Sequence, residues 1–247
     1  MLSRWHRYLD GHPRYLAEHY WWAYLSPWGV WFFDRQPVVN AILFGQYRRI
    51  MAETLRRLCA HRTGRTLQLT GVYGELTAQL AGCVANQELH LMDVAMVQLA
   101  SARAKLRRDP RHAPQARHLA RMNAESLAYA DDSFDTIIIY FLLHELPPDA
   151  RRRALCEALR VLKPGGRLIV AEYGERRARH WLHRAAPLRW LLERAEPFLP
   201  GFWSESLNQT LAGCAATQGK DLQPAGESPV FGGFYRVAEY RMRAAAG

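Results

Sequence analysis

The sequence DDSFDTIIIY at residues 131–140 predicts a turn that leads into a strand buried on both faces. Its second half, Thr136–Tyr140, is a continuous β-branched run of the type found inside parallel sheets. A helix is expected over Pro147–Leu162, because Lys163–Gly166 follows with a proline that cannot continue a helix and glycines that allow positive φ. Arg167–Tyr173 is another buried run, so this stretch predicts a strand–helix–strand unit.

The same alternation extends toward the N-terminus. Further strands are predicted at Thr66–Thr70, Glu88–Met92 and Ala116–Arg121, with helices at Glu75–Val84 and from Asp93 through about Leu106. Strands that alternate with helices of about 10–15 residues indicate βαβ units and a mostly parallel sheet. The predicted fold class is therefore α/β, with helices on both faces of the sheet.

The composition divides the 247 residues into three parts. Residues 1–60 are aromatic and basic and predict an N-terminal helical extension that serves as a lid or a membrane contact. Residues 61–247 predict the α/β domain, with a basic insertion at about 176–212. The net charge of +10 favours anionic partners such as phospholipid headgroups, nucleic acid or acidic substrates.

Aromatic residues are concentrated near the N-terminus. Thirteen of the 28 aromatic residues, including five of the eight tryptophans, fall within residues 1–50 and stand among arginines. Trp and Tyr gather where one end of the ring is apolar and the other wet, as at a membrane interface. An arginine-rich segment with Trp181 and Trp190 follows the strand that ends at Tyr173. We expect both segments to meet an anionic membrane surface; the alternative is that they pack on the core as helical caps.

The location of the protein is predicted from what the sequence lacks. No segment resembles a signal peptide, and no run approaches the roughly 20 apolar residues needed to cross a bilayer. The four cysteines, Cys59, Cys83, Cys156 and Cys214, form no CxxC pair, which argues against a zinc site or a disulfide framework and suits a reducing cytosol. We expect a cytoplasmic protein attached peripherally to the inner face of the membrane. No nucleic acid is expected as a partner, since no RNA-binding appendage is visible.

Parallel sheets bind ligands beyond the carboxyl ends of their strands. In Gly71-Val72-Tyr73-Gly74, glycines let backbone amides approach a ligand, although an ordinary strand-to-helix turn has the same composition. Asp93 follows about 20 residues later, where a carboxylate takes ribose hydroxyls, or alternatively caps a helix. Two further strand ends are followed by polar residues. Together these positions nominate a cofactor site made of Gln68, Gly71, Tyr73, Gly74, Asp93, Asn123, Ala124 and Tyr140.

With these residues assembled, residues 61–175 resemble class I S-adenosylmethionine-dependent methyltransferases. The likeness rests on Asp132–Asp135 leading into the strand, on Leu143–Leu146, and on Glu157–Leu168. It implies a Rossmann-like fold with a mostly parallel seven-stranded sheet and S-adenosylmethionine as co-substrate. It also implies that Asp93 holds the ribose hydroxyls, that Asn123 and Ala124 face the adenine, and that Tyr140 lies near the methionine part.

The first strand departs from the pattern of these enzymes. Their signature is an acidic residue followed by Gly-x-Gly-x-Gly, whereas this sequence has Gln68 at the acidic position and Thr70, Val72 and Gly74 at the glycine positions. A glutamine offers only a neutral amide to the cofactor's ammonium group. The cofactor's amino group is therefore expected to be handled differently here.

This departure is similar to that in the rhodoquinone-biosynthesis (RquA) family. The segments that carry the likeness are Tyr20–Tyr24, Phe32–Asn40, Val72–Thr77, Phe141–Glu145 and Phe231–Arg236. The resemblance implies conversion of ubiquinone to rhodoquinone, in which an amino group replaces a ring methoxy group. It further implies that S-adenosylmethionine donates the amino group and that manganese is required.

Tyr73, His144 and Glu145 are the candidate catalytic residues, and Glu172 is a further polar group at the same edge. His144 and Glu145 follow a buried strand at its ligand-facing end, where they would act as a base or as metal ligands. Manganese prefers carboxylate oxygens and accepts imidazole, so Glu145 is the first candidate ligand and His144 the second. The alternative is that His144 bonds locally and Glu145 caps the turn.

Three other functions compete with amino transfer to a quinone. One is conventional methyl transfer to a lipophilic quinone or quinone precursor. Another is a non-catalytic subunit with this fold, because such a subunit would also lose the glycine signature. A basic RNA methyltransferase is the last.

Overall fold

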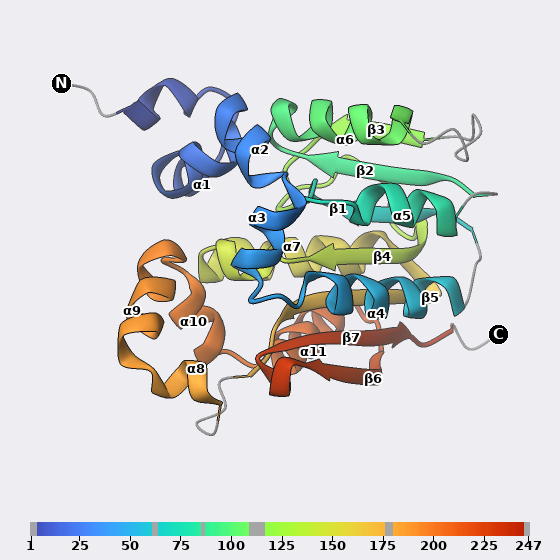
Figure 1. Cartoon of the computed structure of the whole chain (residues 1–247). Helices are drawn as coiled ribbons and strands as arrows, with labels where there is room; N and C mark the ends of the chain where they lie inside the picture. Colours follow the sequence, from blue (N-terminus) through green and yellow to red (C-terminus); the bar gives the residue numbers. More distant parts are fainter. Residues whose placement is uncertain (1–3, 61–63, 85–86, 109–116, 176–179, 245–247) are drawn as a thin grey trace.

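A seven-stranded sheet in the order β3-β2-β1-β4-β5-β7-β6 forms the centre of the protein in a computed structural model (Figure 1). The structure describes residues 4–60, 64–84, 87–108, 117–175 and 180–244. The strands are β1 (Thr66–Leu69), β2 (Leu89–Asp93), β3 (Arg117–Arg121), β4 (Phe134–Tyr140), β5 (Leu162–Tyr173), β6 (Leu222–Val230) and β7 (Tyr235–Met242). Strands β1 to β5 pair in parallel, and β7 runs antiparallel to both β5 and β6. The predicted fold class is confirmed.

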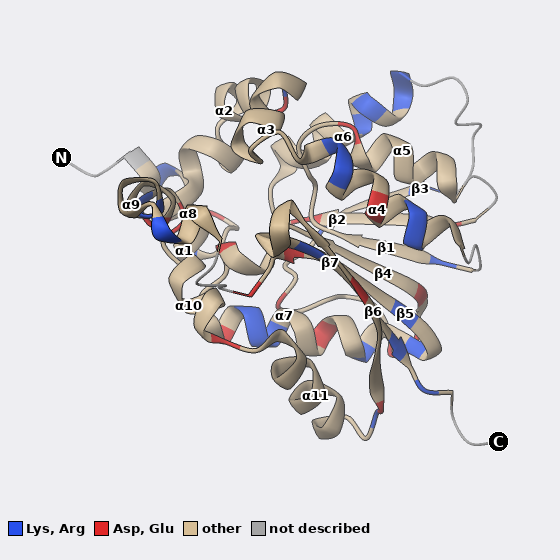
Figure 2. Ribbon diagram, turned by 60° about the horizontal axis from the view of Figure 1, so that its bottom comes forward, with Lys and Arg blue, Asp and Glu red and all other residues tan. Residues whose placement is uncertain are grey.

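Helices cover both faces of the sheet (Figures 1 and 2). On one face lie α4 (Tyr47–Ala60), α5 (Leu76–Cys83) and α6 (Met96–Arg108), and on the other α7 (Pro148–Val161) and α11 (Leu207–Thr217). The central strand β4 is buried by these layers, with Ile137, Ile138 and Ile139 fully inaccessible to solvent. A strand buried on both faces needs apolar residues at every position, which is why the run at 136–140 was recognisable.

The remaining helices gather beyond the carboxyl ends of the parallel strands (Figure 1). From the N-terminal part come η1 (Arg4–Tyr8), α1 (Arg14–Tyr20), the π-helix η2 (Trp21–Leu25), α2 (Pro27–Phe33) and α3 (Gln36–Ile42). From the segment after β5 come α8 (Trp181–Arg184), α9 (Ala186–Ala195) and α10 (Leu199–Ser204). Short 3-10 turns are η3 (Leu143–Glu145) and η4 (Phe231–Gly233). No helix among the described residues is long and apolar enough to cross a membrane.

The predicted boundaries differ from the structure mainly at β5. This strand begins at Leu162, directly after α7, and not at Arg167. The Lys163–Gly166 segment follows the end of the helix as expected, but it forms an irregularity within the strand: Leu162 pairs with Phe134, Arg167 pairs with Thr136, and Gly165 between them has a φ of 77°. Residue 116, the predicted start of β3, lies outside the described residues.

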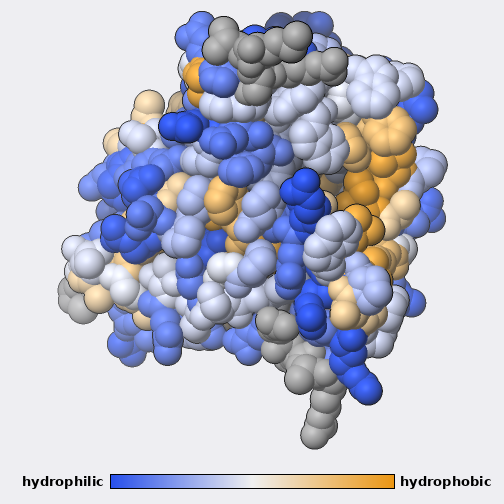
Figure 3. All heavy atoms as spheres, turned by 90° about the vertical axis from the view of Figure 1, so that its left-hand side faces the viewer, coloured by the Kyte–Doolittle hydropathy of each residue, from blue (hydrophilic) through white to orange (hydrophobic). Residues whose placement is uncertain are grey.

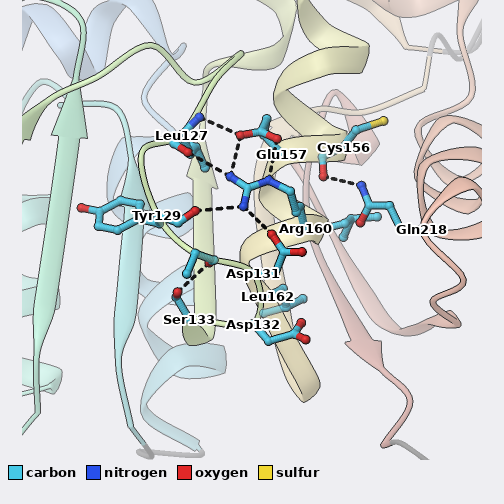
Figure 4. Close-up of polar contacts among 12 residues, drawn as sticks. Leu127, Tyr129, Asp131, Asp132, Ser133, Cys156, Glu157, Arg160, Leu162 and Gln218 are labelled. Carbon is cyan, nitrogen blue, oxygen red and sulfur yellow. Dashed lines mark hydrogen bonds and ion pairs between the residues drawn. The ribbon is translucent and has the colours of Figure 1, made fainter.

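Arg160, a partly exposed arginine at the end of α7, anchors the loop that enters β4 (Figure 4). The Arg160 guanidinium donates to the carbonyls of Leu127 and Tyr129, both at 2.9 Å, and forms ion pairs with Glu157 at 2.7 Å and Asp131 at 2.6 Å. Asp131 and Asp132 therefore belong to the turn at the amino-terminal edge of the sheet, as their position before the strand predicted. The loop is held because several otherwise unpaired carbonyls share one cation.

The four cysteines form two disulfides, so the prediction that they build no disulfide framework is wrong. Cys59 of α4 is joined to Cys83 of α5, and Cys156 of α7 to Cys214 of α11. The pairs are 24 and 58 residues apart in sequence, and they meet because the helices that carry them pack side by side on the sheet. Cysteine spacing therefore gives no support for a reducing compartment.

We expect reduction of the two disulfides to destabilise the protein. Loops of 24 and 58 residues each restrict the unfolded chain enough to contribute about 3 to 4 kcal/mol. Urea unfolding with and without a phosphine reductant measures the loss, and the variant Cys156→Ser/Cys214→Ser isolates the longer loop. Maleimide labelling of the unreduced, denatured protein at all four cysteines would contradict the pairing.

Candidate functional site

A cavity of about 270 Å³ lies beyond the carboxyl ends of the parallel strands. Strand order reverses between β1 and β4, the place where open parallel sheets bind ligands. The floor of the cavity comes from residues that end or follow β1, β2, β3 and β4. The walls come from α1, η2, α2 and α3 and from the end of α9. The wall is mainly aromatic and apolar.

Eight of the ten predicted site residues line this cavity. They are Gly71, Tyr73, Asp93, Asn123, Ala124, Tyr140, His144 and Glu145. They come from four strand ends that are separated by more than 70 residues of sequence, and the topology of the sheet brings them together.

Gln68 and Gly74 do not line the cavity. The buried Gln68 amide donates to the carbonyl of Thr70 at 3.0 Å and to the hydroxyl of Thr77 at 3.1 Å, so it ties β1 to α5. The Gly74 amide donates to Asp34 at the end of α2, at 2.8 Å. Gly74 has a φ of 79° and lies against the Tyr47 ring, which leaves no room for a side chain.

Asp93 is almost fully buried and has partners on both carboxylate oxygens. One oxygen accepts from the Thr70 hydroxyl and the Gly71 amide, both at 2.7 Å, and the other from the Ala95 amide at 2.7 Å. Burial raises the pKa of Asp93, and these hydrogen bonds oppose that rise. Asp93 therefore caps the turn before α6 and also faces the cavity, so each of the two alternatives has structural support.

Thr70 keeps the backbone of a glycine. Its φ is 81°, in the left-handed region, at the first glycine position of the methyltransferase signature. A non-glycine residue there costs on the order of 1–2 kcal/mol, and the hydroxyl bond to Asp93 offsets part of this cost. The backbone at this turn therefore has the conformation that suits glycine, although the residue is threonine.

The N-terminal segment closes the cavity from above. The Tyr73 hydroxyl donates to the carbonyl of Ala23 at 2.7 Å, and the Tyr73 ring stacks on Tyr24 with 5.5 Å between centroids. The Tyr15 hydroxyl donates to Glu125 at 2.9 Å, next to Asn123. Residues of the N-terminal extension are therefore part of the cavity wall.

A buried histidine lies among three carboxylates at one side of the cavity. His144 Nδ1 is 2.7 Å from Glu172 Oε1, and Glu172 also accepts from the amides of Leu143 at 3.0 Å and Tyr173 at 2.8 Å. Because Nδ1 faces Glu172, Nε2 faces the other two carboxylates, with Glu145 Oε1 and Glu196 Oε2 each 3.9 Å away. We call His144, Glu145, Glu172 and Glu196 the acidic–histidine cluster.

Two tyrosines of the N-terminal segment bind this cluster. The Tyr24 hydroxyl donates to Glu145, and the Tyr20 hydroxyl donates to Glu196 at 3.0 Å. Burial raises the pKa of Glu145 and of Glu196, and the proximity of His144 opposes both shifts. Burial alone would lower the pKa of His144, but the carboxylates, Glu172 first, outweigh it and raise that pKa to about 9. The raised pKa values of His144 and Glu145 favour protonation of the cluster at neutral pH.

Glu196, Tyr20 and Tyr24 are the site residues that sequence reasoning missed. Glu196 stands in a basic segment with no strand or motif beside it, and the two tyrosines are part of an aromatic-rich stretch that predicted a surface. The spacing of four residues between Tyr20 and Tyr24 was the available signal, since it places both on one side of a helical segment.

A fully buried arginine positions the turn that carries His144 and Glu145. Arg151 donates to the carbonyls of Leu143 at 2.8 Å and Leu146 at 2.9 Å, and it forms an ion pair with Glu205 at 2.6 Å. These bonds join η3 to the segment after α10, because a buried guanidinium must satisfy its donors.

Comparison with known proteins gives a family match and partial relatives. The model of the ubiE/COQ5 methyltransferase family matches residues 33–186. The ubiquinone/menaquinone biosynthesis C-methyltransferase UbiE of Proteus mirabilis is 38% identical over 133 residues, which cover 53% of this chain and 51% of that protein. UbiE of Vibrio campbellii is 35% identical over 140 residues, 56% of this chain and 52% of that protein. The matched part thus spans about half the length of these curated relatives.

Solved structures share the fold over most of the chain. An O-methyltransferase family protein from Burkholderia thailandensis has a TM-score of 0.60 at 14% identity and covers 85% of this chain and 60% of that one. The N-methyltransferase NodS from Bradyrhizobium japonicum, in complex with S-adenosyl-L-homocysteine, has a TM-score of 0.51 at 16% identity and covers 85% and 90%. The cyclase SpnF has a TM-score of 0.56 at 19% identity, covering 90% and 98%. These likenesses show the Rossmann-like class I methyltransferase fold.

Replacing the positioning arginine is expected to destabilise the site. Arg151→Ala leaves two buried carbonyls and one carboxylate without their donor, which costs about 3 kcal/mol of folding free energy. The free energy of urea unfolding measures this loss. Arg152→Ala, on the exposed side of the same helix, is the matched control. Equal stability of the two variants would show that Arg151 does not hold the turn.

Proposed function

Because this chain belongs to the ubiE/COQ5 methyltransferase family, we propose that it binds S-adenosylmethionine and transfers a group from it to the ring of a lipophilic quinone. The observation that carries the proposal is the joining of two features in one cavity. Gly71, Asp93 and Asn123 line one part of it, and the acidic–histidine cluster lines another through His144, Glu145 and Glu196. A donor and an acceptor bound there would be adjacent.

The residues around Asp93 suit the adenosine part of the cofactor. Asp93 has accepted three hydrogen bonds, and a carboxylate has capacity for about one more, which a ribose hydroxyl would fill. Asn123 and Ala124 would face the adenine. The Tyr140 hydroxyl is buried and makes no hydrogen bond within the part of the chain that the structure describes, so a bound molecule would satisfy it.

The aromatic wall suits a quinone ring. Tyr24 and Tyr73 are stacked at the cavity, and Phe141 and Tyr173 also line it. Flat aromatic faces favour a flat ring by offset or edge contacts, and the acidic–histidine cluster would meet the ring oxygens with hydrogen bonds. His144 would exchange a proton with the substrate, held in orientation by Glu172.

The curated relatives favour methyl transfer, since those named above are C-methyltransferases. Methyl transfer to the ring of a quinone precursor is therefore the first reaction to test. In it, the proton that the methyl group replaces on the ring would pass to the acidic–histidine cluster, after a member of the cluster has first released its own proton.

Amino transfer to ubiquinone, as in the rhodoquinone-biosynthesis family, is the second candidate, and a specific observation favours it. The β1 position that is acidic in methyltransferases is Gln68, and its amide is used inside the fold by Thr70 and Thr77. No carboxylate from β1 would hold the cofactor's ammonium group as an ion pair. Without that ion pair, the amino group of S-adenosylmethionine would be held less tightly, which suits a group that must react.

The acidic–histidine cluster offers the donor types that the manganese needed for amino transfer would accept, but its ligand atoms are not gathered within 4.8 Å of one another and would have to close around an ion. Glu145, His144 and Glu196 offer carboxylate oxygens and an imidazole, the donors that manganese accepts, and His144 Nε2 lies 3.9 Å from an oxygen of each carboxylate. Tyr20 and Tyr24 would then hold the ligands in place by their bonds to Glu196 and Glu145. When bound, the metal would act as a Lewis acid on a ring carbonyl.

The N-terminal residues 1–60 would act as a lid over this cavity, and the basic insertion at about 176–212 would complete it. Tyr15, Tyr20 and Tyr24 from the first and Glu196 from the second line the cavity.

The face around this lid would meet an anionic phospholipid membrane, from which a quinone is taken. Trp28 and Trp31 on α2 are 66% and 56% exposed, and Trp190 on α9 is 64% exposed. The Arg35 guanidinium lies 3.6 Å from the centre of the Trp31 ring, so an apolar ring and a cation are presented together. Figure 3, which views this end of the molecule, shows apolar side chains gathered along one margin beside strongly hydrophilic ones.

Labelled S-adenosylmethionine separates the two reactions. With a ¹³C methyl group and a ¹⁵N amino group, methyl transfer is expected to place ¹³C in a ring-demethylated quinol. Amino transfer is expected to place ¹⁵N in the aminoquinone that forms from ubiquinone when manganese is added. Mass spectrometry of the extracted quinone reads both. His144→Gln is expected to lower turnover about 100-fold or more, because proton transfer is lost, whereas Arg152→Ala is the unaffected control.

If neither label enters any quinone while calorimetry shows cofactor binding, the transferase proposal fails and the non-catalytic subunit is the better function. If no cofactor binds, both fail.

Membrane contact is tested by flotation with vesicles that contain an anionic phospholipid. Trp28→Ser/Trp190→Ser is expected to lower the bound fraction roughly tenfold, because two interfacial rings are lost. Arg243→Ser, an exposed arginine at the opposite edge of the sheet, is the control for charge alone. Equal flotation of the two variants, or none by the unaltered protein, would remove the membrane from the proposal.

A further inference from the structure

A second group of chemistry-bearing side chains lies at the amino-terminal ends of β2 and β3, at the opposite edge of the sheet from the cavity. His90 of β2 and His118 of β3 are paired in the parallel register, so both side chains point to the same face. Their rings stack with 4.4 Å between centroids. Glu88 lies two residues before His90 and shares that face, and one ligand atom from each of the three lies within 4.8 Å of the others.

We propose that Glu88, His90 and His118 form a binding site for a divalent transition-metal ion of the zinc, nickel or copper type. Two imidazoles and one carboxylate are the donors these ions take, and a water would complete a tetrahedron. Bonds of about 2.0–2.1 Å place neighbouring tetrahedral ligands roughly 3.4 Å apart. Glu88 Oε2 and His90 Nε2 are already 3.5 Å apart. His118 is exposed, so its ring can turn the remaining distance toward them.

The buried histidine is held in the orientation that ligation needs. His90 Nδ1 lies 3.3 Å from the Tyr129 hydroxyl, which leaves Nε2 toward Glu88. The rings of Tyr129 and Phe134 meet the His90 ring edge-on, at 5.5 and 5.1 Å between centroids. A hydrogen bond from outside the ligand set that orients a histidine ring is the usual support of a metal site.

Arg65 competes for the carboxylate. Its Nε lies 2.5 Å from Glu88 Oε2, with the guanidinium 5.7 Å from the centre of the Phe134 ring. A metal would have to share or displace this ion pair, and the nearby positive charge opposes a second cation. The site is therefore tuned toward modest affinity, and removing the arginine charge is expected to tighten it.

A metal ion at this site would cross-link the edge strand β3 to β2. β3 is the last strand on its side and is joined to the sheet through β2. An ion that binds one ligand from β3 and two from the start of β2 adds a link between them that does not depend on backbone hydrogen bonds. Because an ion bound only in the folded state stabilises that state, binding is expected to raise the thermal midpoint.

The test uses the full chain without a histidine tag, stripped with EDTA and titrated with Zn²⁺ or Ni²⁺ by calorimetry. The expected result, in the His144→Gln background that removes the imidazole of the acidic–histidine cluster, is one ion per chain with a raised thermal midpoint. His118→Ala, whose side chain is exposed, is expected to weaken binding at least tenfold while the far-ultraviolet circular dichroism is unchanged. His19→Ala, another exposed histidine, is the matched control. Arg65→Gln is expected to bind more tightly than the unaltered chain.

The same titration in the His144→Gln background separates this site from the acidic–histidine cluster. Zn²⁺ binding that survives His144→Gln but is lost in His118→Ala supports the proposal. Binding that survives His118→Ala and Glu88→Gln, or is lost only in His144→Gln, overturns it. This outcome is independent of the proposed transferase activity.

Discussion

The pairing of β1 with β2 on one side and β4 on the other is the constraint on which the cavity depends. β1 has only four residues, all buried, and its register places Leu69 beside Met92 and Ile139. The chain leaves these three strands in different directions, so the turns after them diverge and leave a space at the carboxyl edge. Any slip in this register would turn side chains to the other face of the sheet and would move Asp93 and Tyr140 away from each other.

Burying a histidine with three carboxylates is costly unless the charges are compensated. The fold compensates them with backbone amides on Glu172, with tyrosine hydroxyls on Glu145 and Glu196, and with a positive charge on His144. The carboxylates and the groups that compensate them come from β5, from the turn after β4, from the N-terminal helices and from the end of α9. The cluster therefore exists only when these four segments are assembled, so the N-terminal helices are part of the arrangement on which the proposed chemistry depends.

The altered glycine turn shows that the path of the backbone and the identity of its residues are separable. Thr70 adopts the left-handed conformation that glycine would adopt, and its hydroxyl donates a hydrogen bond to Asp93. Gln68 stands at the acidic position of the methyltransferase signature, and its neutral amide bonds to Thr70 and Thr77 inside the fold. The family's scaffold is retained, while the position that is acidic in the methyltransferase signature carries no charge.

Local composition was enough to predict the strands at β4 and β5, the helix between them and the order of Gly71, Asp93, Asn123 and Tyr140, because burial and strand-to-helix turns leave signals within a few residues. Those signals also determined the fold class, since βαβ units admit few arrangements. The disulfide partners, the place of Glu196 beside His144 and the register of His90 with His118 were decided only by the tertiary structure. Each depends on the packing of segments that are distant in sequence. Such packing is determined by the burial of whole helices and strands, so it leaves no signal at any single residue.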